Sequence, residues 1–231
     1  MLSIKNIHFS YGSVEALHDV SIECEPGKIT CIIGRNGVGK TTLMQSVMGN
    51  NQITKGSIIV SGNDVGGLPA HKRAHQGLAL VPHGREIFPK LSVEENLKIG
   101  LCARTDGVRE VPKEITETFP ILEEMKNRRG GDLSGGQQQQ LAIGRALAGG
   151  PQVMLLDEPT EGIQPNVIQE IGRVLRKLAD ERNMTIVLVE QYLDFVKEIA
   201  DNFYIMDRGK VVASGETTEL SEELIDRHLK V

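Results

Sequence analysis

Residues 34–42 read Gly34-Arg35-Asn36-Gly37-Val38-Gly39-Lys40-Thr41-Thr42. This stretch fits the pattern G-x-x-x-x-G-K-[ST] at every constrained position. The pattern requires a strand before the loop and a helix after it, and the apolar runs 28–33 and 43–48 supply both. Glycines let backbone N–H groups point at phosphate oxygens, and the helix adds the positive end of its dipole. The whole stretch is therefore predicted to bind ATP, with Lys40 reaching the β- and γ-phosphates, the Thr41 hydroxyl on Mg²⁺ and Thr42 near the α-phosphate.

A pair of carboxylates, Asp157 and Glu158, directly follows the short apolar run 153–156. Such a run is typical of a buried parallel strand, and open α/β sheets bind ligands at the carboxyl ends of their strands. Asp157 is placed to hold Mg²⁺, directly or through water. Glu158 is the candidate catalytic residue that orients and polarises the attacking water, because the metal keeps Asp157 ionised. The alternative, two solvated carboxylates at a strand end, is disfavoured by the loop at 34–42.

A third segment, Leu133-Ser134-Gly135-Gly136-Gln137, precedes an expected helix over 138–148. Ser134 can cap that helix, and the two glycines leave backbone N–H groups open to a phosphate. Together with the loop and the acidic pair, this segment resembles the signature of the ABC ATPases. The chain is accordingly similar, over nearly its whole length, to the nucleotide-binding subunit of an ABC transporter.

The resemblance implies an α/β fold, with a P-loop NTPase core of mostly parallel sheet, an antiparallel N-terminal β region and a helical insertion. It implies one ABC ATPase domain over residues 1–231, in which a helical subdomain at approximately 84–150 faces the permease. It also implies a dimer with an identical or sister ATPase subunit, where the signature 133–137 binds the partner's ATP. The residues themselves predict strands over 2–9, 20–25, 56–60, 153–156 and 184–189, and helices over 93–100 and 112–119.

Several further positions at the expected ATP site are interpreted through the same resemblance. Tyr11 matches the aromatic that stacks on adenine, with strand-end packing as the alternative. Gln191 stands where the family usually has His, and we expect it to position the γ-phosphate without titrating, because an amide carries no charge. His83 stands where the family usually has Gln, and two interpretations remain open: a contact to Mg²⁺ or the attacking water, or a role in loop shape. Residues 161–164, Glu-Gly-Ile-Gln, replace the usual Ser-Ala-Leu-Asp, which leaves a cross-subunit contact in doubt.

Composition excludes several classes of protein. With 231 residues the chain is long enough to bury the core of one α/β domain, and its net charge of −5 gives no basic footprint for nucleic acid. Cys24, Cys31 and Cys102 have no CxxC pairing and are predicted to be buried, reduced thiols. Residues 1–7 show no cationic segment followed by a long apolar core, so we do not expect a secretory signal, and no apolar run approaches the length needed to cross a bilayer. We therefore expect a peripheral protein at the cytoplasmic face of the inner or plasma membrane, bound to separate permease subunits.

The cargo is indicated only by resemblance. Segments 128–132, 137–140, 157–165 and 190–195 are most similar to the urea-type importer subunit, and more broadly to the second ATPase subunit of branched-chain amino acid importers. Such subunits work with a sister ATPase, permease subunits and, indirectly, a substrate-binding protein. A soluble ABC ATPase acting on DNA or ribosomes is the alternative from another class, disfavoured because the chain has one compact cassette and no heptad run.

Two finer expectations concern the helical region. The segment 84–91 is expected to carry opening of the ATPase dimer to the permease, with Ile87 and Phe88 as either its apolar contacts or local core. Gln139 and Gln140 are expected on ordinary polar faces of their helix.

Overall fold

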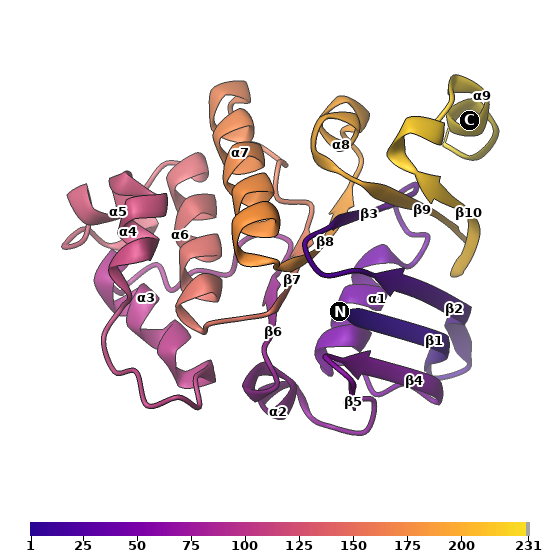
Figure 1. Cartoon of the computed structure of the whole chain (residues 1–231), viewed down its shortest axis with the longest axis horizontal. Coiled ribbons are helices and arrows are strands. Elements are labelled where there is room, and N and C mark those ends of the chain that lie inside the picture. The colour runs from indigo at the N-terminus through magenta and orange to yellow at the C-terminus, as the bar shows by residue number, and fades with distance from the viewer. Residues whose placement is uncertain (230–231) are drawn as a thin grey trace.

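The computed structural model describes residues 1–229 and contains two β-sheets with helices packed around them (Figure 1). The larger sheet has six strands in the spatial order β10 (Lys210–Glu216), β9 (Asn202–Asp207), β3 (Ile29–Ile33), β8 (Thr185–Glu190), β7 (Val153–Asp157) and β6 (Leu78–Val81). Its strands run parallel except β10, which pairs antiparallel with β9. The smaller sheet is antiparallel, in the order β2 (Val14–Cys24), β1 (Leu2–Tyr11), β4 (Lys55–Val60) and β5 (Asn63–Asp64). This architecture confirms the predicted fold class.

Helices connect the parallel strands. Helix α1 (Lys40–Met48) follows β3, α2 (Ala70–His75) precedes β6, and α7 (Pro165–Arg182) joins β7 to β8. The chain between β6 and β7 forms α3 (Val93–Gly100), η1 (Leu101–Ala103), α4 (Lys113–Thr118), α5 (Pro120–Glu124), η2 (Gly130–Asp132) and α6 (Gly135–Ala148). The described C-terminal part adds α8 (Leu193–Ile199), η3 (Thr217–Glu219) and α9 (Glu222–His228).

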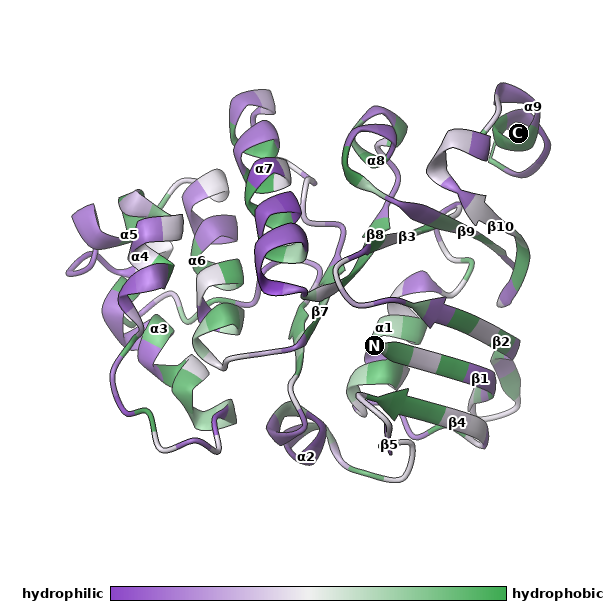
Figure 2. Cartoon of the chain, in the orientation of Figure 1, coloured by the Kyte–Doolittle hydropathy of each residue, from purple (hydrophilic) through white to green (hydrophobic). Residues whose placement is uncertain are grey.

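The six-stranded sheet is covered on both faces. In β3, Cys31 and Ile33 point into a core shared with the helices after β6, whereas Ile32 points into a second core shared with α1 and the smaller sheet. In β8, Leu188 points into the first of these cores and Val189 into the second. Burial on both faces explains why these strands are continuous apolar runs without polar alternation. Figure 2 shows the hydrophobic strands inside and hydrophilic turns of α7 on the outside.

One predicted helix boundary is wrong. Helix α6 begins at Gly135 and not at residue 138, because the Ser134 hydroxyl accepts a hydrogen bond from the Gln137 N–H and the Gln137 side chain accepts one from the Ser134 N–H. The helix predicted over 112–119 is present as α4, within one residue at each end. A separate short helix, α5, begins at Pro120, which has no N–H to extend α4. Helix α3 has the predicted bounds and its capping box at Ser92.

Burial corrects two further expectations. Gln139 and Gln140 are buried and do not lie on polar faces, because α6 packs against α3, α4, α5 and α7. Cys102 is exposed, whereas Cys24 and Cys31 are buried, and all three are free thiols.

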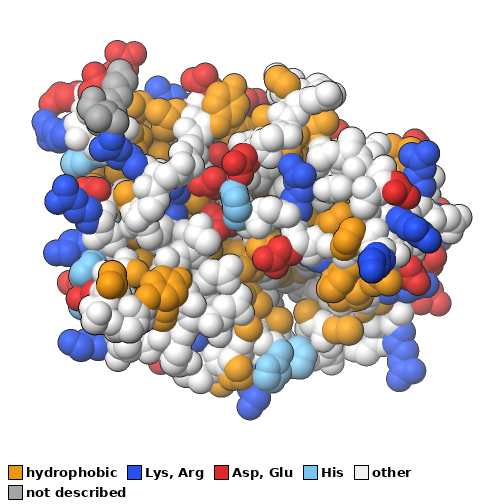
Figure 3. Space-filling view, turned by 180° about the vertical axis from the view of Figure 1, so that it is seen from behind, with side chains coloured by type: hydrophobic (Ala, Val, Ile, Leu, Met, Phe, Trp, Pro, Cys, Tyr) orange, Lys and Arg blue, Asp and Glu red, His pale blue; other side chains and the backbone are white. Residues whose placement is uncertain are grey.

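The surface carries no broad concentration of one charge on the face shown in Figure 3, where acidic and basic side chains are interspersed. Ile87 is partly buried against the core, whereas Phe88 is 44% exposed with the Arg145 guanidinium 5.3 Å from its ring centre. Among residues 1–229, no helix combines the length and the apolar character that spanning a membrane requires.

Candidate active site

The loop at 34–42 joins β3 to α1, as its sequence pattern requires. A Cβ at Gly34 would lie 2.5 Å from the Met206 carbonyl oxygen, and Gly39 has a φ of 109°, so both positions need glycine. Lys40 is only 5% exposed, and its Nζ donates hydrogen bonds to the carbonyl oxygens of Gly34 at 2.8 Å and Arg35 at 3.0 Å. Burial lowers the pKa of Lys40, against the opposing effect of the nearby acidic pair. The ammonium group is thus held at the inner side of the loop.

This loop opens onto a cavity of about 470 Å³, a volume in the range of small-molecule sites. It is lined by residues 36–42, Tyr11 and Glu158, and the sequence analysis predicted each of them at the ATP site. Tyr11 is 55% exposed, and the centre of its ring lies 4.7 Å from that of Phe9 in an edge-to-face contact. The cavity is also lined by residues that no sequence motif indicated: Val14, Glu15, Ala16, His18, Arg208 and Gly209.

Asp157 ends β7 and is 2% exposed. Neither of its carboxylate oxygens has a hydrogen-bond partner of acceptable geometry within residues 1–229. Burial raises the pKa of Asp157, and the Thr41 hydroxyl opposes that shift. Buried carboxylates without partners are rare and destabilising, so this one is suited to a cation. Hard oxygen donors of this kind fit Mg²⁺, and Asp157 together with the nearby Thr41 hydroxyl could hold one.

Glu158 follows directly and adopts a left-handed backbone conformation, with φ of 50°. Its N–H donates to the Val189 carbonyl oxygen at 2.9 Å, which fixes the turn at the end of β7. The side chain is 16% exposed, and its Oε1 lies 3.8 Å from Lys40 Nζ. Glu158 therefore approaches the loop 34–42 from the end of β7, which β8 separates from β3 in the sheet.

Gln191 connects these two parts of the site. Its Nε2 donates to Glu158 Oε1 at 2.7 Å and to Asn36 Oδ1, within the loop, also at 2.7 Å. An amide nitrogen has two hydrogens, so a single side chain can make both bonds. Gln191 thereby holds the Glu158 carboxylate beside the loop.

Glu190 is a functional candidate that sequence reasoning missed. It is buried at the end of β8, where its carboxylate accepts hydrogen bonds from the backbone N–H groups of Thr160 at 3.0 Å and Gln191 at 3.0 Å. Burial raises the pKa of Glu190, and these hydrogen bonds oppose that shift. The carboxylate fixes the loop after β7 to the loop after β8. An acidic residue at the end of an otherwise apolar strand was the available signal.

His83 lies on the other side of Glu158 from Gln191. Its side chain is 50% exposed, with Nδ1 at 3.8 Å from Glu158 Oε2 and 3.3 Å from Glu161 Oε2. Both carboxylates belong to the segment that follows β7. The structure therefore directs His83 at the acidic segment.

The signature 133–137 lies apart from this cavity. Leu133 is buried in the core and anchors the segment, whereas Ser134 is exposed at the N-terminus of α6. None of these five residues is among those that line the cavity of the same chain. They can act on a nucleotide only if another surface brings one to them.

A phosphate-binding loop and an acidic strand end facing one cavity define a P-loop ATPase. The family model described as "ABC transporter" matches residues 17–161. The chain belongs to the ABC transporter family and is an ABC-type ATPase.

Three known proteins show the extent of the similarity. The high-affinity branched-chain amino acid transport ATP-binding protein BraG of Pseudomonas aeruginosa is 41% identical, in a match covering 92% of this chain and 91% of BraG. The probable branched-chain amino acid transport ATP-binding protein LivF of Archaeoglobus fulgidus is 36% identical over 96% of this chain and 94% of LivF. The crystal structure of the ADP conformation of MJ1267, an ATP-binding cassette of an ABC transporter, superposes with a TM-score of 0.80 at 29% identity, covering 98% of this chain and 93% of MJ1267.

Proposed function

We propose that this chain is the ATP-hydrolysing subunit that energises an ABC importer of a small polar solute. The observation that carries the hydrolytic role is the buried Asp157 carboxylate, which lacks a hydrogen-bond partner within residues 1–229 and lies close to the Thr41 hydroxyl. These two residues would hold Mg²⁺. When bound, Mg²⁺ would neutralise charge on the phosphates.

The remaining residues have separate roles in ATP binding and hydrolysis. Residues 34–42 bind the triphosphate through backbone N–H groups and Lys40, and Tyr11 stacks on the adenine. Glu158 accepts a hydrogen bond from the attacking water and aligns it in line with the γ-phosphate. Gln191 keeps Glu158 in that position through its bond to Oε1, which is already formed in this structure.

Assembly follows from the position of the signature. Because residues 133–137 do not line the cavity of their own chain, we infer that they bind the ATP of a second ATPase subunit, identical or sister. The helical segment 84–150 and its exposed Phe88 would contact the permease, at the cytoplasmic face of the membrane. A substrate-binding protein would act on the permease and so only indirectly on this chain.

Two cargoes are supported by different observations. The segments quoted above resemble the urea-type subunit, which favours urea. BraG and LivF are named for branched-chain amino acid transport, which favours leucine, isoleucine or valine. ATP-dependent uptake of labelled urea and labelled leucine into vesicles holding the reconstituted transporter separates them. Uptake of neither, with co-purification of ribosomes in place of a membrane partner, would refute the importer assignment.

The hydrolytic role is tested by Glu158→Gln, which keeps the size and polarity of the side chain but removes its charge. We expect MgATP binding to persist while turnover falls by at least about 100-fold, the usual contribution of a positioned acid or base. Glu94→Gln is the matched control, because Glu94 lies exposed on α3, away from the cavity, and forms an ion pair with Lys98. Retained hydrolysis in Glu158→Gln would show that another residue directs the water.

A further inference from the structure

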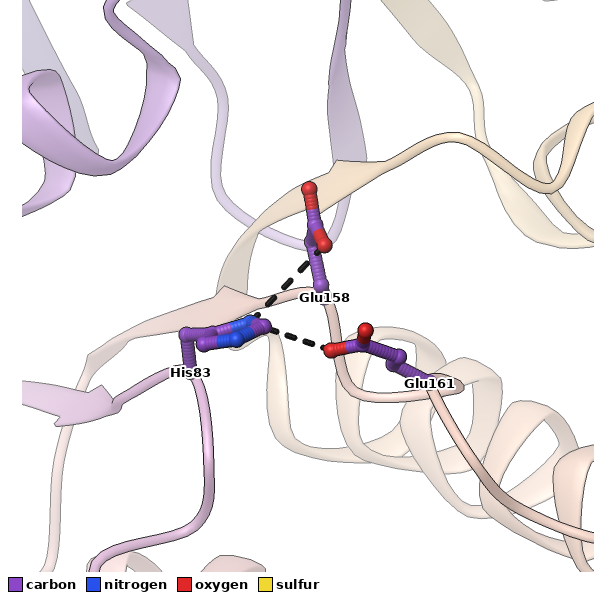
Figure 4. Close-up of side chains that lie close together, drawn as sticks. All are labelled: His83, Glu158 and Glu161. Atoms are coloured by element: carbon purple, nitrogen blue, oxygen red, sulfur yellow. Dashed lines mark ion pairs between the residues drawn. The ribbon is translucent and has the colours of Figure 1, made fainter. Parts of the chain in front are cut away.

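The ends of β6 and β7 bring together a second set of metal-ligand atoms. Val81 of β6 pairs with Leu156 of β7 in parallel register, so the residues two positions further on, His83 and Glu158, leave the sheet side by side. Glu161 lies in the loop that follows β7. Figure 4 shows the His83 imidazole facing the carboxylates of Glu158 and Glu161. One nitrogen and two carboxylate oxygens therefore converge on one point.

The separations suit a small transition-metal ion. His83 Nδ1 lies 3.8 Å from Glu158 Oε2 and 3.3 Å from Glu161 Oε2, and all three atoms lie within 4.8 Å of one another. With Zn²⁺ bonds near 2.1 Å, the ligand atoms of a tetrahedral site are separated by about 3.4 Å. The two distances to His83 are thus close to those of a formed site. Rotation of the exposed Glu161 side chain can adjust the third distance, between the Glu158 and Glu161 oxygens.

The two carboxylate oxygens of Glu158 have different partners. Its Oε1 accepts the hydrogen bond from Gln191 and lies near Lys40, whereas Oε2 is directed at His83. Glu158 itself is fixed by the backbone bond to Val189, so one ligand is already positioned. The half-exposed His83 and the exposed Glu161 leave the point open to an ion from solution.

The ligand atoms of His83, Glu158 and Glu161 differ in type from those of the proposed Mg²⁺ site at Asp157 and Thr41. A hydroxyl and a carboxylate suit Mg²⁺, whereas an imidazole with two carboxylates suits Zn²⁺ and related ions. Three protein ligands also leave a fourth coordination position for water. Occupancy of the two positions is therefore expected to depend on different metals.

We propose that His83, Glu158 and Glu161 form an inhibitory Zn²⁺ site. Zn²⁺ bound to Oε2 would neutralise the Glu158 carboxylate and hold it away from the attacking water. ATP turnover would then fall on addition of Zn²⁺ even in excess Mg²⁺. The inhibition rests on the proposed role of Glu158 in hydrolysis, whereas the binding of Zn²⁺ does not.

Calorimetric titration of Zn²⁺ into the metal-free, nucleotide-free full chain tests the site directly. We expect one tight Zn²⁺ per chain, weakened at least tenfold by His83→Gln and by Glu161→Gln, since loss of even an outer partner of a metal ligand weakens binding by about 10- to 100-fold. His75→Gln is the control, because His75 is an exposed histidine of α2 outside the cluster. Unchanged melting temperatures in the variants would show that they are folded.

Steady-state ATPase measurements with saturating Mg²⁺ give the second readout, with each variant compared to its own zinc-free rate. Zinc should inhibit the wild-type chain and His75→Gln, with inhibition shifted to at least tenfold higher Zn²⁺ in His83→Gln and Glu161→Gln. Absence of tight binding, or binding that survives both cluster substitutions, would overturn the proposed site. Binding that requires the cluster but leaves turnover unchanged would support the site and refute the water-directing role of Glu158.

Discussion

The Gln191 side chain holds the Glu158 carboxylate against the phosphate-binding loop, and Gln191→Ala removes that connection. Two hydrogen bonds of 2.7 Å are lost, one to Asn36 and one to the charged Glu158. A hydrogen bond to a charged group contributes about 1.5 to 3 kcal/mol net. Gln191 is exposed, so water competes for these groups and the lower value applies. About 1.5 kcal/mol corresponds to a roughly tenfold lower kcat.

Steady-state hydrolysis across a range of MgATP concentrations checks this prediction. We expect kcat to fall about tenfold with KM nearly unchanged, because the loop and Lys40 bind the ground-state phosphates without Gln191. Gln191→His should recover much of the rate through its ring N–H and introduce a pH dependence near about 6.5, which an amide cannot show. A wild-type kcat in Gln191→Ala, or a change confined to KM, would refute the positioning role.

Three other predictions concern stability and nucleotide affinity. Arg73→Ala should lower the free energy of unfolding by about 3 to 5 kcal/mol in urea titrations, because the buried guanidinium donates to four backbone carbonyl oxygens, two of them in α1. Asp201→Asn should destabilise the chain at pH 7 by about 1 kcal/mol. Burial alone would raise the pKa of Asp201, but the hydrogen bonds from Arg176 and a backbone N–H outweigh burial, so the net pKa in the folded chain is lowered. The difference in the free energy of unfolding should therefore be lost as the pH falls from about 3.9 through this lowered pKa. Tyr11→Ala should weaken ATP binding at least about fivefold in fluorescence titrations, whereas Tyr11→Phe should not, since stacking contributes about 1 kcal/mol or more.

The sequence predicted the fold class because its decisive segments are locally constrained. Residues 34–42 satisfy a pattern in which nearly every position has one chemical reason, and the strands buried on both faces leave continuous apolar runs. The capping box at Ser92 marked the start of α3 for the same local reason. Such signals can be interpreted without knowledge of tertiary contacts.

Other features depend on contacts between distant parts of the chain. Gln191 meets Asn36 across 155 positions, so no local pattern indicates that bond. Gln139 and Gln140 look like surface residues, and only the packing of neighbouring helices around α6 buries them. Glu15, His18 and Arg208 line the cavity through the pairing of strands, not through a motif.

The most direct test of the hydrolytic mechanism is a structure of the Glu158→Gln chain with bound MgATP. We expect the triphosphate within the loop 34–42, Mg²⁺ beside Thr41 and Asp157, and the signature 133–137 of a second copy or sister subunit against the γ-phosphate. A loop without nucleotide, or a triphosphate whose metal lies away from Asp157, would contradict the proposed mechanism.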